Sequence, residues 1–431
     1  MTLNSTNPET LVLHAGYRAD PTTGSVAVPI YQTTSFQFKN TEHAANLFSL
    51  SELGNIYTRI MNPTCDVLEQ RITALEGGAA ALAVSSGQSA TAISIQNLAK
   101  AGDNIISSTD LYGGTWNLFN NTLKDQGVEV RFVDPSDPEQ FKKAADKRTR
   151  AYYAETLPNP KLNVFPITEV ASIGRELGIP LIMDNTAAPI LCRPFEQGAA
   201  VVVYSTTKYI GGHGTTIGGL IVDGGNFPWA DHKDRQPALN QPDPSYHGAV
   251  WVEAVEPIGP VAYIIKARTT LLRDLGSAFS PFNAFQVIQG LETLPLRMRE
   301  HSKNAEAVAE FLVKQQTVGK VIHPSLQEGL VKKNAQKYLK GGFGGLVGFE
   351  LKAGGAAGRK FIDSLELFYH VANIGDARSL AIHPSSTTHS QLSPDEQLAT
   401  GVSDGYVRLS IGLEHIDDIL KDLQQALAKA T

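Results

Sequence analysis

Short apolar runs alternate with longer amphipathic segments between residues 61 and 281. The runs have the length and composition of buried strands, and they lie at residues 80–85, 104–107, 128–133, 151–154, 180–183, 201–204 and 218–222. Segments with helical character separate most of them, for example residues 64–76, 115–126 and 167–177. This alternation predicts an α/β fold with a mostly parallel sheet and helices on both of its faces.

The regions on either side of this segment have different patterns. Residues 1–60 show little helical periodicity and predict an extended arm, which would bury little surface alone and is expected to pack on a neighbouring subunit. Residues 282–314 favour a helix with a kink at Pro295, and they lead into a smaller α+β domain. The predicted organisation is an arm over residues 1–60, a large domain over 61–281 and a C-terminal domain over 282–431. Residues 224–250 are rich in Gly and Pro and predict a loop.

Composition excludes several classes of protein. The chain has 431 residues, of which 42% are hydrophobic and 19% are charged, and its net charge of −6 gives no indication of a nucleic-acid partner. Two cysteines in a chain of this length do not make a disulfide framework, and no metal-ligand spacing occurs. No signal pattern and no apolar run of membrane-spanning length is present. We therefore expect a cytoplasmic protein with neither a metal nor a membrane partner.

Two polar side chains at predicted strand ends give the first indication of chemistry. Lys208 follows the apolar run 201–204 and three hydroxyl residues, and Asp184 ends the run 180–183. A lone lysine is usually a surface charge, and an aspartate after a strand often caps a helix. Because ligands collect at the carboxyl ends of parallel strands, however, the two can share one cofactor. A lysine that binds pyridoxal phosphate covalently and an aspartate that keeps its pyridine nitrogen protonated make such a pair.

Several further motifs occur in a fixed order along the chain. They stand at residues 57–64, 85–90, 112–115, 155–160, 184–186, 205–208, 383–389 and 407–414. Together they resemble the Cys/Met-metabolism family of pyridoxal-phosphate enzymes, and the resemblance covers essentially the whole chain. It implies the aspartate aminotransferase type of fold, with the large domain as the one that binds pyridoxal 5′-phosphate. It also implies a homo-oligomer, which we expect to be a homotetramer.

The resemblance assigns cofactor-binding roles to residues of these motifs. Lys208 would hold the cofactor and move protons, and Asp184 would pair with the pyridine nitrogen. Tyr112 would lie on the cofactor ring and assist the leaving group, and Asn159 would bind the ring hydroxyl oxygen. The phosphate would be held by Ser86, Gly87, Gln88, Thr186, Ser205 and Thr207, with Tyr57 and Arg59 reaching it from the neighbouring subunit. Without the resemblance, Ser86–Gly87 would indicate an ordinary turn, and Arg59 a surface charge.

The substrate and the reaction follow from the same resemblance. Arg408 would bind the substrate carboxylate through its planar fork, and Asn373 would contact the same group. The 242–248 and 280–298 segments resemble the branch that performs γ-replacement on O-acetylhomoserine with sulfide or a small thiol, giving homocysteine or methionine and acetate. We therefore expect the partners to be small-molecule substrates. We also expect the reaction to belong to methionine biosynthesis.

Three alternatives stay open. An O-succinylhomoserine sulfhydrylase and a methionine γ-lyase would use the same cofactor chemistry. Gly114 stands where γ-lyases typically have a cysteine, which argues against the second. A non-catalytic partner protein with this fold is less compatible with intact Lys208, Asp184 and Arg408.

Overall fold

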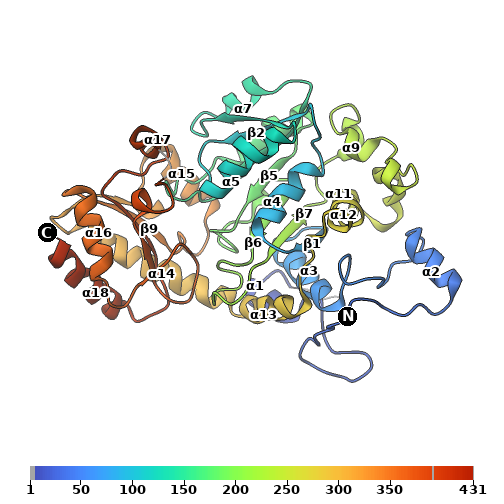
Figure 1. The fold of residues 1–431 in the computed structure, drawn as a ribbon, viewed down its shortest axis with the longest axis horizontal. Helices are drawn as coiled ribbons and strands as arrows, with labels where there is room; N and C mark the ends of the chain where they lie inside the picture. Colours follow the sequence, from blue (N-terminus) through green and yellow to red (C-terminus); the bar gives the residue numbers. More distant parts are fainter. Residues whose placement is uncertain (1–4, 391–392, 431) are drawn as a thin grey trace.

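A large, mostly parallel sheet forms the centre of the computed structural model, which describes residues 5–390 and 393–430 (Figure 1). Its strand order is β1-β7-β6-β5-β4-β2-β3. The strands are β1 (Ala80–Val84), β2 (Asn104–Ser108), β3 (Glu129–Val133), β4 (Thr149–Glu155), β5 (Leu181–Asp184), β6 (Val201–Ser205) and β7 (Gly219–Asp223). Strand β7 runs in the opposite direction to the other six. The predicted α/β fold with a mostly parallel sheet is confirmed, and each predicted strand has its counterpart within about a residue or two at either end.

Alternate side chains of each strand pack into two separate cores, one on each face of the sheet. In β1, for example, Ala81 and Ala83 belong to one core, whereas Leu82 and Val84 belong to the other. This division follows from the two-residue period of a strand. Helices α1 (Pro8–His14), α3 (Pro63–Glu76), α8 (Ile167–Leu177) and α13 (Pro281–Glu292) cover the first face, and α4 (Gly87–Gln96) and α11 (Ala262–Ala267) cover the second.

Shorter helices complete the large domain. The helical run expected at residues 115–126 is present but is divided by a π-helical turn at Leu118–Thr122, between α5 (Gly113–Asn117) and α6 (Leu123–Asp125). A π-helical turn contains one more residue than an α-helical turn, because its backbone hydrogen bonds join residues five apart. Hydrophobic periodicity alone does not reveal such a turn. The other short α-helices here are α7 (Glu139–Ala144), α9 (Pro237–Asn240), α10 (Trp251–Ala254) and α12 (Arg273–Leu275).

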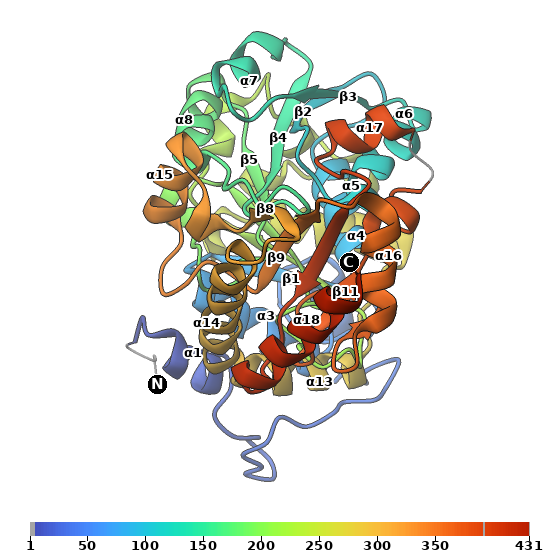
Figure 2. The ribbon, with the colours of Figure 1, turned by 90° about the vertical axis from the view of Figure 1, so that its left-hand side faces the viewer.

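A second, five-stranded sheet lies in the C-terminal part of the chain, in the order β10-β11-β12-β9-β8. Its strands are β8 (Val318–Ile322), β9 (Leu346–Leu351), β10 (Tyr369–His370), β11 (Leu380–Ile382) and β12 (Tyr406–Ser410). Helices α14 (Leu294–Val313), α16 (Gly354–Ser364) and α18 (Ile416–Ala430) pack on it around a third core (Figure 2). Helices α15 (Gly329–Tyr338) and α17 (Pro394–Ala399) complete this region. The exact domain boundaries stay a prediction.

The corner between α13 and α14 joins the two regions. One helix ends before Thr293 and the next begins after it. Pro295 therefore lies in the first turn of a new helix, where proline is tolerated, and does not kink a continuous helix. Arg297 is buried there and donates to the carbonyl oxygens of Tyr209 at 2.7 Å and Ile210 at 3.1 Å, and to that of Gly290 at 2.6 Å. This guanidinium therefore ties the corner to the segment that follows Lys208.

The N-terminal arm leaves the body of the molecule on the side opposite the C-terminal helices (Figure 1). It contains α1 and one further short helix, α2 (Thr41–Phe48), which the weak periodicity did not predict. Apolar side chains on the arm face solvent in the single chain, including Val26 at 82% exposure and Leu53 at 62%. Large apolar groups left in water indicate a surface that another chain can cover.

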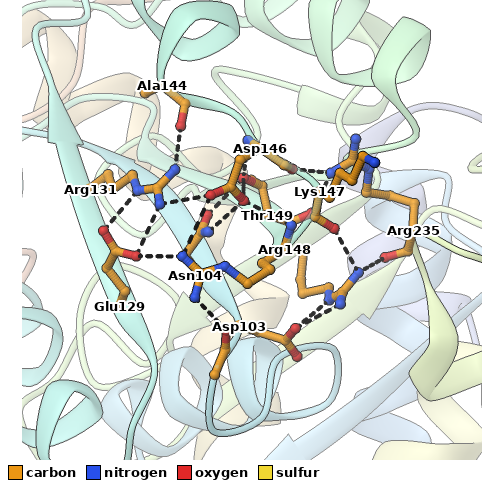
Figure 3. Close-up of polar contacts among 12 residues, drawn as sticks. Asp103, Asn104, Glu129, Arg131, Ala144, Asp146, Lys147, Arg148, Thr149 and Arg235 are labelled. Carbon is orange, nitrogen blue, oxygen red and sulfur yellow. Dashed lines mark hydrogen bonds and ion pairs between the residues drawn. The ribbon is translucent and has the colours of Figure 1, made fainter.

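The opposite edge of the large sheet, away from the carboxyl strand ends, is held by a network of arginines and carboxylates (Figure 3). Arg150 pairs with Asp103 at 2.7 Å, and Arg131 pairs with Asp146 at 2.8 Å. Gln236, which is fully buried, donates to the carbonyl oxygens of Arg150 and Gly178. The predicted loop at 224–250 is thus anchored to the sheet, and it includes the short helix α9.

A buried polar chain beneath the sheet links α3 to the ends of β5 and β6. The hydroxyl of Tyr204 donates to Glu76 Oε1 at 2.6 Å and accepts from the amide of Asn185 at 2.7 Å. The second oxygen of Glu76 has no partner within the described chain. Burial therefore raises the pKa of Glu76 from its ordinary 4.5 to about 7, although the Tyr204 hydroxyl opposes this.

Glu76→Gln should stabilise the protein at alkaline pH. Between pH 4.5 and about 7 the folded chain holds a proton that the unfolded chain releases, so the parent loses stability as pH rises. The variant lacks this loss, and its advantage should grow from pH 5 to pH 8 by on the order of 1–3 kcal/mol. Thermal midpoints at pH 5, 6.5 and 8 measure it, with the exposed Glu310→Gln as control. A difference that does not vary with pH would contradict the assignment.

Candidate active site

A cavity of about 250 Å³ opens at the carboxyl ends of β4, β5 and β6, between the large sheet and the C-terminal region. These three strands are adjacent and parallel, so their last residues meet at one edge. Most of the residues that the sequence singles out line this one cavity: Ser86, Gly87, Gln88, Tyr112, Asn159, Asp184, Thr186, Ser205, Thr207, Lys208, Asn373 and Arg408. Tyr57 and Arg59 do not.

Lys208 lies three residues beyond the end of β6. Its Nζ donates to the side-chain oxygen of Asn373 at 2.6 Å, which brings the amine to the C-terminal side of the cavity. Burial, together with the positive charge of Arg408, lowers the pKa of the Lys208 amine to about 8. A larger share of this amine is therefore neutral near pH 7 than for an exposed lysine, and a neutral amine can act as a nucleophile or accept a proton.

Asp184 ends β5 and faces the cavity without a cation beside it. One carboxyl oxygen accepts from the backbone N–H of Thr186 at 2.9 Å, and the other lies 3.4 Å from the hydroxyl of Tyr153. No ion pair of Asp184 forms in residues 5–390 and 393–430, and burial raises its pKa. A buried carboxylate in this state favours a positive partner, and a protonated pyridine nitrogen supplies one.

The first turn of α4 and the end of β6 form a narrow polar recess. The backbone of Gly87 comes so close to Ser205 that a Cβ at position 87 would lie 2.5 Å from the Ser205 Cβ. The first N–H groups of a helix have no intrahelical acceptor, so those of α4 suit an anion such as phosphate. Hydroxyls of Ser205 and Thr207 line the same recess. The Thr186 hydroxyl lines the same cavity and accepts from the backbone N–H of Ser205 at 2.8 Å.

Two further groups face the cavity with unmet hydrogen-bonding capacity. The side-chain oxygen of Asn159 and the Nε of Arg408 are buried and lack a partner in the described chain. Arg408, in β12, makes one hydrogen bond of 2.9 Å to the backbone oxygen of Asn373, and no carboxylate pairs with it in that part. Buried polar groups without partners are rare and cost free energy, so a bound cofactor and a substrate carboxylate fit here.

Tyr57 and Arg59 lie elsewhere in the single chain. They line a separate cavity with residues 32–34 and 278–281, and the Arg59 guanidinium donates to the backbone oxygen of Arg273. The guanidinium also stands 5.5 Å from the centre of the Tyr57 ring. A single chain therefore does not bring these two residues to the other predicted phosphate-binding groups.

Sequence reasoning missed Glu155, the last residue of β4, which also lines the cavity. It belongs to the motif at 155–160 but received no role. Its position at a strand end next to Asp184 was the signal that could have identified it. Elsewhere, no group of three or more His, Cys, Asp or Glu side chains in the described residues could hold a metal ion, and no helix there is long and apolar enough to span a membrane.

Comparisons with known proteins agree with this geometry. The chain is 56% identical to O-acetyl-L-homoserine sulfhydrylase of Leptospira meyeri, over 97% of this chain and 96% of the relative. It is 47% identical to homocysteine synthase of Schizosaccharomyces pombe over the full length of both. A crystal structure from Campylobacter jejuni, described as an O-acetylhomoserine (thiol)-lyase with N′-pyridoxyl-lysine-5′-monophosphate, superposes with a TM-score of 0.93 at 43% identity. The superposition includes 98% of this chain and all of the Campylobacter jejuni chain. The model of the Cys/Met metabolism PLP-dependent enzyme family matches residues 9–428, and the chain belongs to this family.

Proposed function

We propose that the protein catalyses γ-replacement, converting O-acetyl-L-homoserine and sulfide, or a small thiol, into L-homocysteine or L-methionine and acetate. The observation that carries the proposal is one cavity that presents Lys208 with a lowered pKa and, among the residues that the structure describes, Asp184 without a cation and Arg408 without an anion. The relatives at 44–56% identity that are named O-acetyl-L-homoserine sulfhydrylase support the choice of substrate. Their names also favour the acetyl over the succinyl ester.

The residues of the cavity divide the work of this reaction. When bound, pyridoxal phosphate withdraws electrons from the α-carbon of an amino acid, and Asp184 keeps its ring nitrogen protonated. Arg408 binds the substrate carboxylate and so orients the substrate with the C–H bond of its α-carbon toward Lys208. Lys208 accepts the proton from the α-carbon and then moves protons at the β-carbon, so that acetate can leave from the γ-carbon and sulfide can add there. Tyr112 stands at the cavity mouth, half exposed, where it can assist the leaving group.

We infer that Gly114 has a physical role in the choice between replacement and lysis. A Cβ at position 114 would lie 2.5 Å from Cε1 of the Tyr112 ring and 3.0 Å from Nε2 of Gln88. The tyrosine ring thus occupies the space that any side chain at 114 would need. A cysteine there, as the γ-lyase pattern has it, requires another position of Tyr112. The methionine γ-lyase alternative is disfavoured on this ground.

The active unit is proposed to be at least a dimer, and a homotetramer is the form that we favour. Tyr57 and Arg59 resemble the family's pair that reaches the phosphate from a neighbouring subunit, and in one chain they lie away from the cavity. The exposed apolar residues of the arm support such an association. A cytoplasmic location is part of the same proposal, and it is supported by the two buried, unbridged cysteines.

With sulfide present, O-acetylhomoserine should be converted far faster than methionine is cleaved. The reason is that the Tyr112 ring leaves no room for the γ-lyase side chain at 114. Homocysteine formed from the ester is compared with α-ketobutyrate released from methionine, with Lys208→Ala as the inactive control. Parallel assays with the succinyl ester test the acyl preference. Faster cleavage of methionine would refute the proposed reaction while leaving the cofactor assignment intact.

Gly114→Ala should lower kcat for the ester by roughly tenfold or more, because the added methyl group must displace the Tyr112 ring or Gln88. Gly113→Ala is the matched control, since a Cβ at 113 meets no atom within 4 Å. Steady-state kinetics of both variants, loaded with cofactor to the same extent, provide the measurement. Equal kinetics of the two variants would show that the position of the Tyr112 ring has no influence on turnover.

Mixing two inactive variants should restore activity if the sites are shared between subunits. Arg59→Ala removes the arm's contribution and Lys208→Ala removes the amine. After subunit exchange, a random mixed population in equal amounts has half heterodimers, each with one intact site of two, so about one quarter of the parent activity is expected. Sedimentation of the parent gives the oligomeric state. A monomer with full activity would contradict shared sites.

A further inference from the structure

Two carboxyl groups stand side by side at the edge of the large sheet. The parallel register of β4 and β5 pairs Glu155 with Asp184, each the last residue of its strand. Both line the cavity, and Glu155 is only 8% exposed. The family chemistry gives a role to Asp184 but leaves Glu155 without one.

The surroundings of this pair do not offer a counter-charge to both carboxyl groups. Neither acid forms an ion pair in the described residues. The nearby Asp110 adds negative charge, and its own partner is Lys161 at 2.6 Å. The cations that line the cavity, Lys208 and Arg408, are hydrogen-bonded to Asn373. Because the two acids are adjacent and no cation of the described residues pairs with either, their mutual repulsion favours a state in which the pair retains one proton.

Hydrogen bonds decide which acid keeps that proton. Asp184 accepts from the Thr186 backbone N–H at 2.9 Å and faces the Tyr153 hydroxyl at 3.4 Å, so its ionised form is supported by more than one donor. Glu155 accepts one hydrogen bond in the described chain, from the backbone N–H of Tyr112 at 2.6 Å. Burial, followed by the charge of Asp184, raises the pKa of Glu155 well above its usual value. A cation beside Asp184 would increase this difference further.

The hydrogen bond that Glu155 accepts helps to hold the turn at Tyr112. Tyr112 directly precedes α5, at a turn followed by two glycines, and its ring packs over Gly114. Its backbone N–H donates directly to the Glu155 carboxyl, and both residues line the cavity. Removing that acceptor would leave the N–H unsatisfied in a partly buried position and release the turn that places the ring.

We propose that Glu155 is a positioning residue that holds a proton in the working enzyme, fixes Tyr112 at the cavity and leaves Asp184 as the one ionised carboxylate. The proposal rests on the pyridoxal phosphate chemistry given above, in which Asp184 faces a cation and Tyr112 faces the leaving group. It predicts that an uncharged side chain with an acceptor oxygen can replace Glu155, whereas a side chain without an acceptor cannot.

The test compares Glu155→Gln with Glu155→Ala in the full-length enzyme. Glutamine keeps an acceptor for the Tyr112 N–H and resembles the neutral acid, so its cofactor affinity and its kcat should exceed those of the alanine variant by roughly tenfold or more. Cofactor affinity is measured by equilibrium dialysis and by the absorbance band of the bound cofactor, neither of which needs a substrate. Asp223→Asn is the matched control, because Asp223 is a buried carboxylate at the far end of β7.

Infrared spectroscopy reports the proton directly. At pH 9, where Glu76 and Asp223 with pKa values of about 7 are ionised, the parent should show the C=O stretch of a neutral carboxylic acid that disappears in Glu155→Gln and persists in Asp223→Asn. Absence of this difference, or a glutamine variant as weak in cofactor binding as the alanine variant, would overturn the proposal. Should Glu155→Ala fail to fold, the infrared comparison of the parent with Glu155→Gln still decides. A parent that binds cofactor but does not convert O-acetylhomoserine would refute the proposed reaction alone.

Discussion

The parallel pairing of β4, β5 and β6 is the constraint on which the rest of the site depends. Three adjacent strands that run the same way end at one edge, so consecutive segments of the sequence deliver their polar residues to one place. Glu155 and Asp184 are 29 residues apart in the chain, and Asp184 and Lys208 are 24 apart, but all three line a single cavity. A slip of one residue in the register of β4 or β5 would turn Glu155 or Asp184 to the opposite face of the sheet. The two dense cores on either side of the sheet hold that register.

Polar groups left without partners distinguish this cavity from the structural networks elsewhere. At the opposite edge of the sheet, arginines and carboxylates pair with one another, as Arg131 does with Asp146 (Figure 3). In the cavity, by contrast, residues 5–390 and 393–430 provide no cation for Asp184, no anion for Arg408 and no donor for the Asn159 oxygen. Such groups cost stability unless a ligand completes them. The fold therefore places its incomplete charges where the cofactor and substrate supply the missing partners.

Much of this arrangement could be predicted from the sequence, for reasons that the elements make clear. The apolar runs that became β5 and β6 are continuous because both faces of the sheet are covered, and Asp184 and Lys208 stood out as charges that close those runs. Helix α2 was not predicted, because tertiary packing decides it. The π-helical turn after α5 was not predicted either, because it depends on one extra residue in a helical turn. Glu155 was missed because a carboxylate before a turn has many ordinary explanations, and only the register shows it beside Asp184. In the sequence, the significance of Gly114 rested on family resemblance alone. The structure adds that a Cβ at this position would collide with the Tyr112 ring.

Arg297 joins the segment after Lys208 to the corner of α13 and α14 through neutral acceptors, which are the backbone carbonyl oxygens of Tyr209, Ile210 and Gly290 and the hydroxyl of Thr293. No carboxylate pairs with this guanidinium in the described part of the chain, and burial lowers its pKa to about 10. Dissolved ions weaken a bond between two opposite charges, but they act much less on a buried cation held by neutral dipoles. The junction that fixes the Lys208 segment against the C-terminal region is thus of a kind whose strength changes little between dilute buffer and concentrated salt.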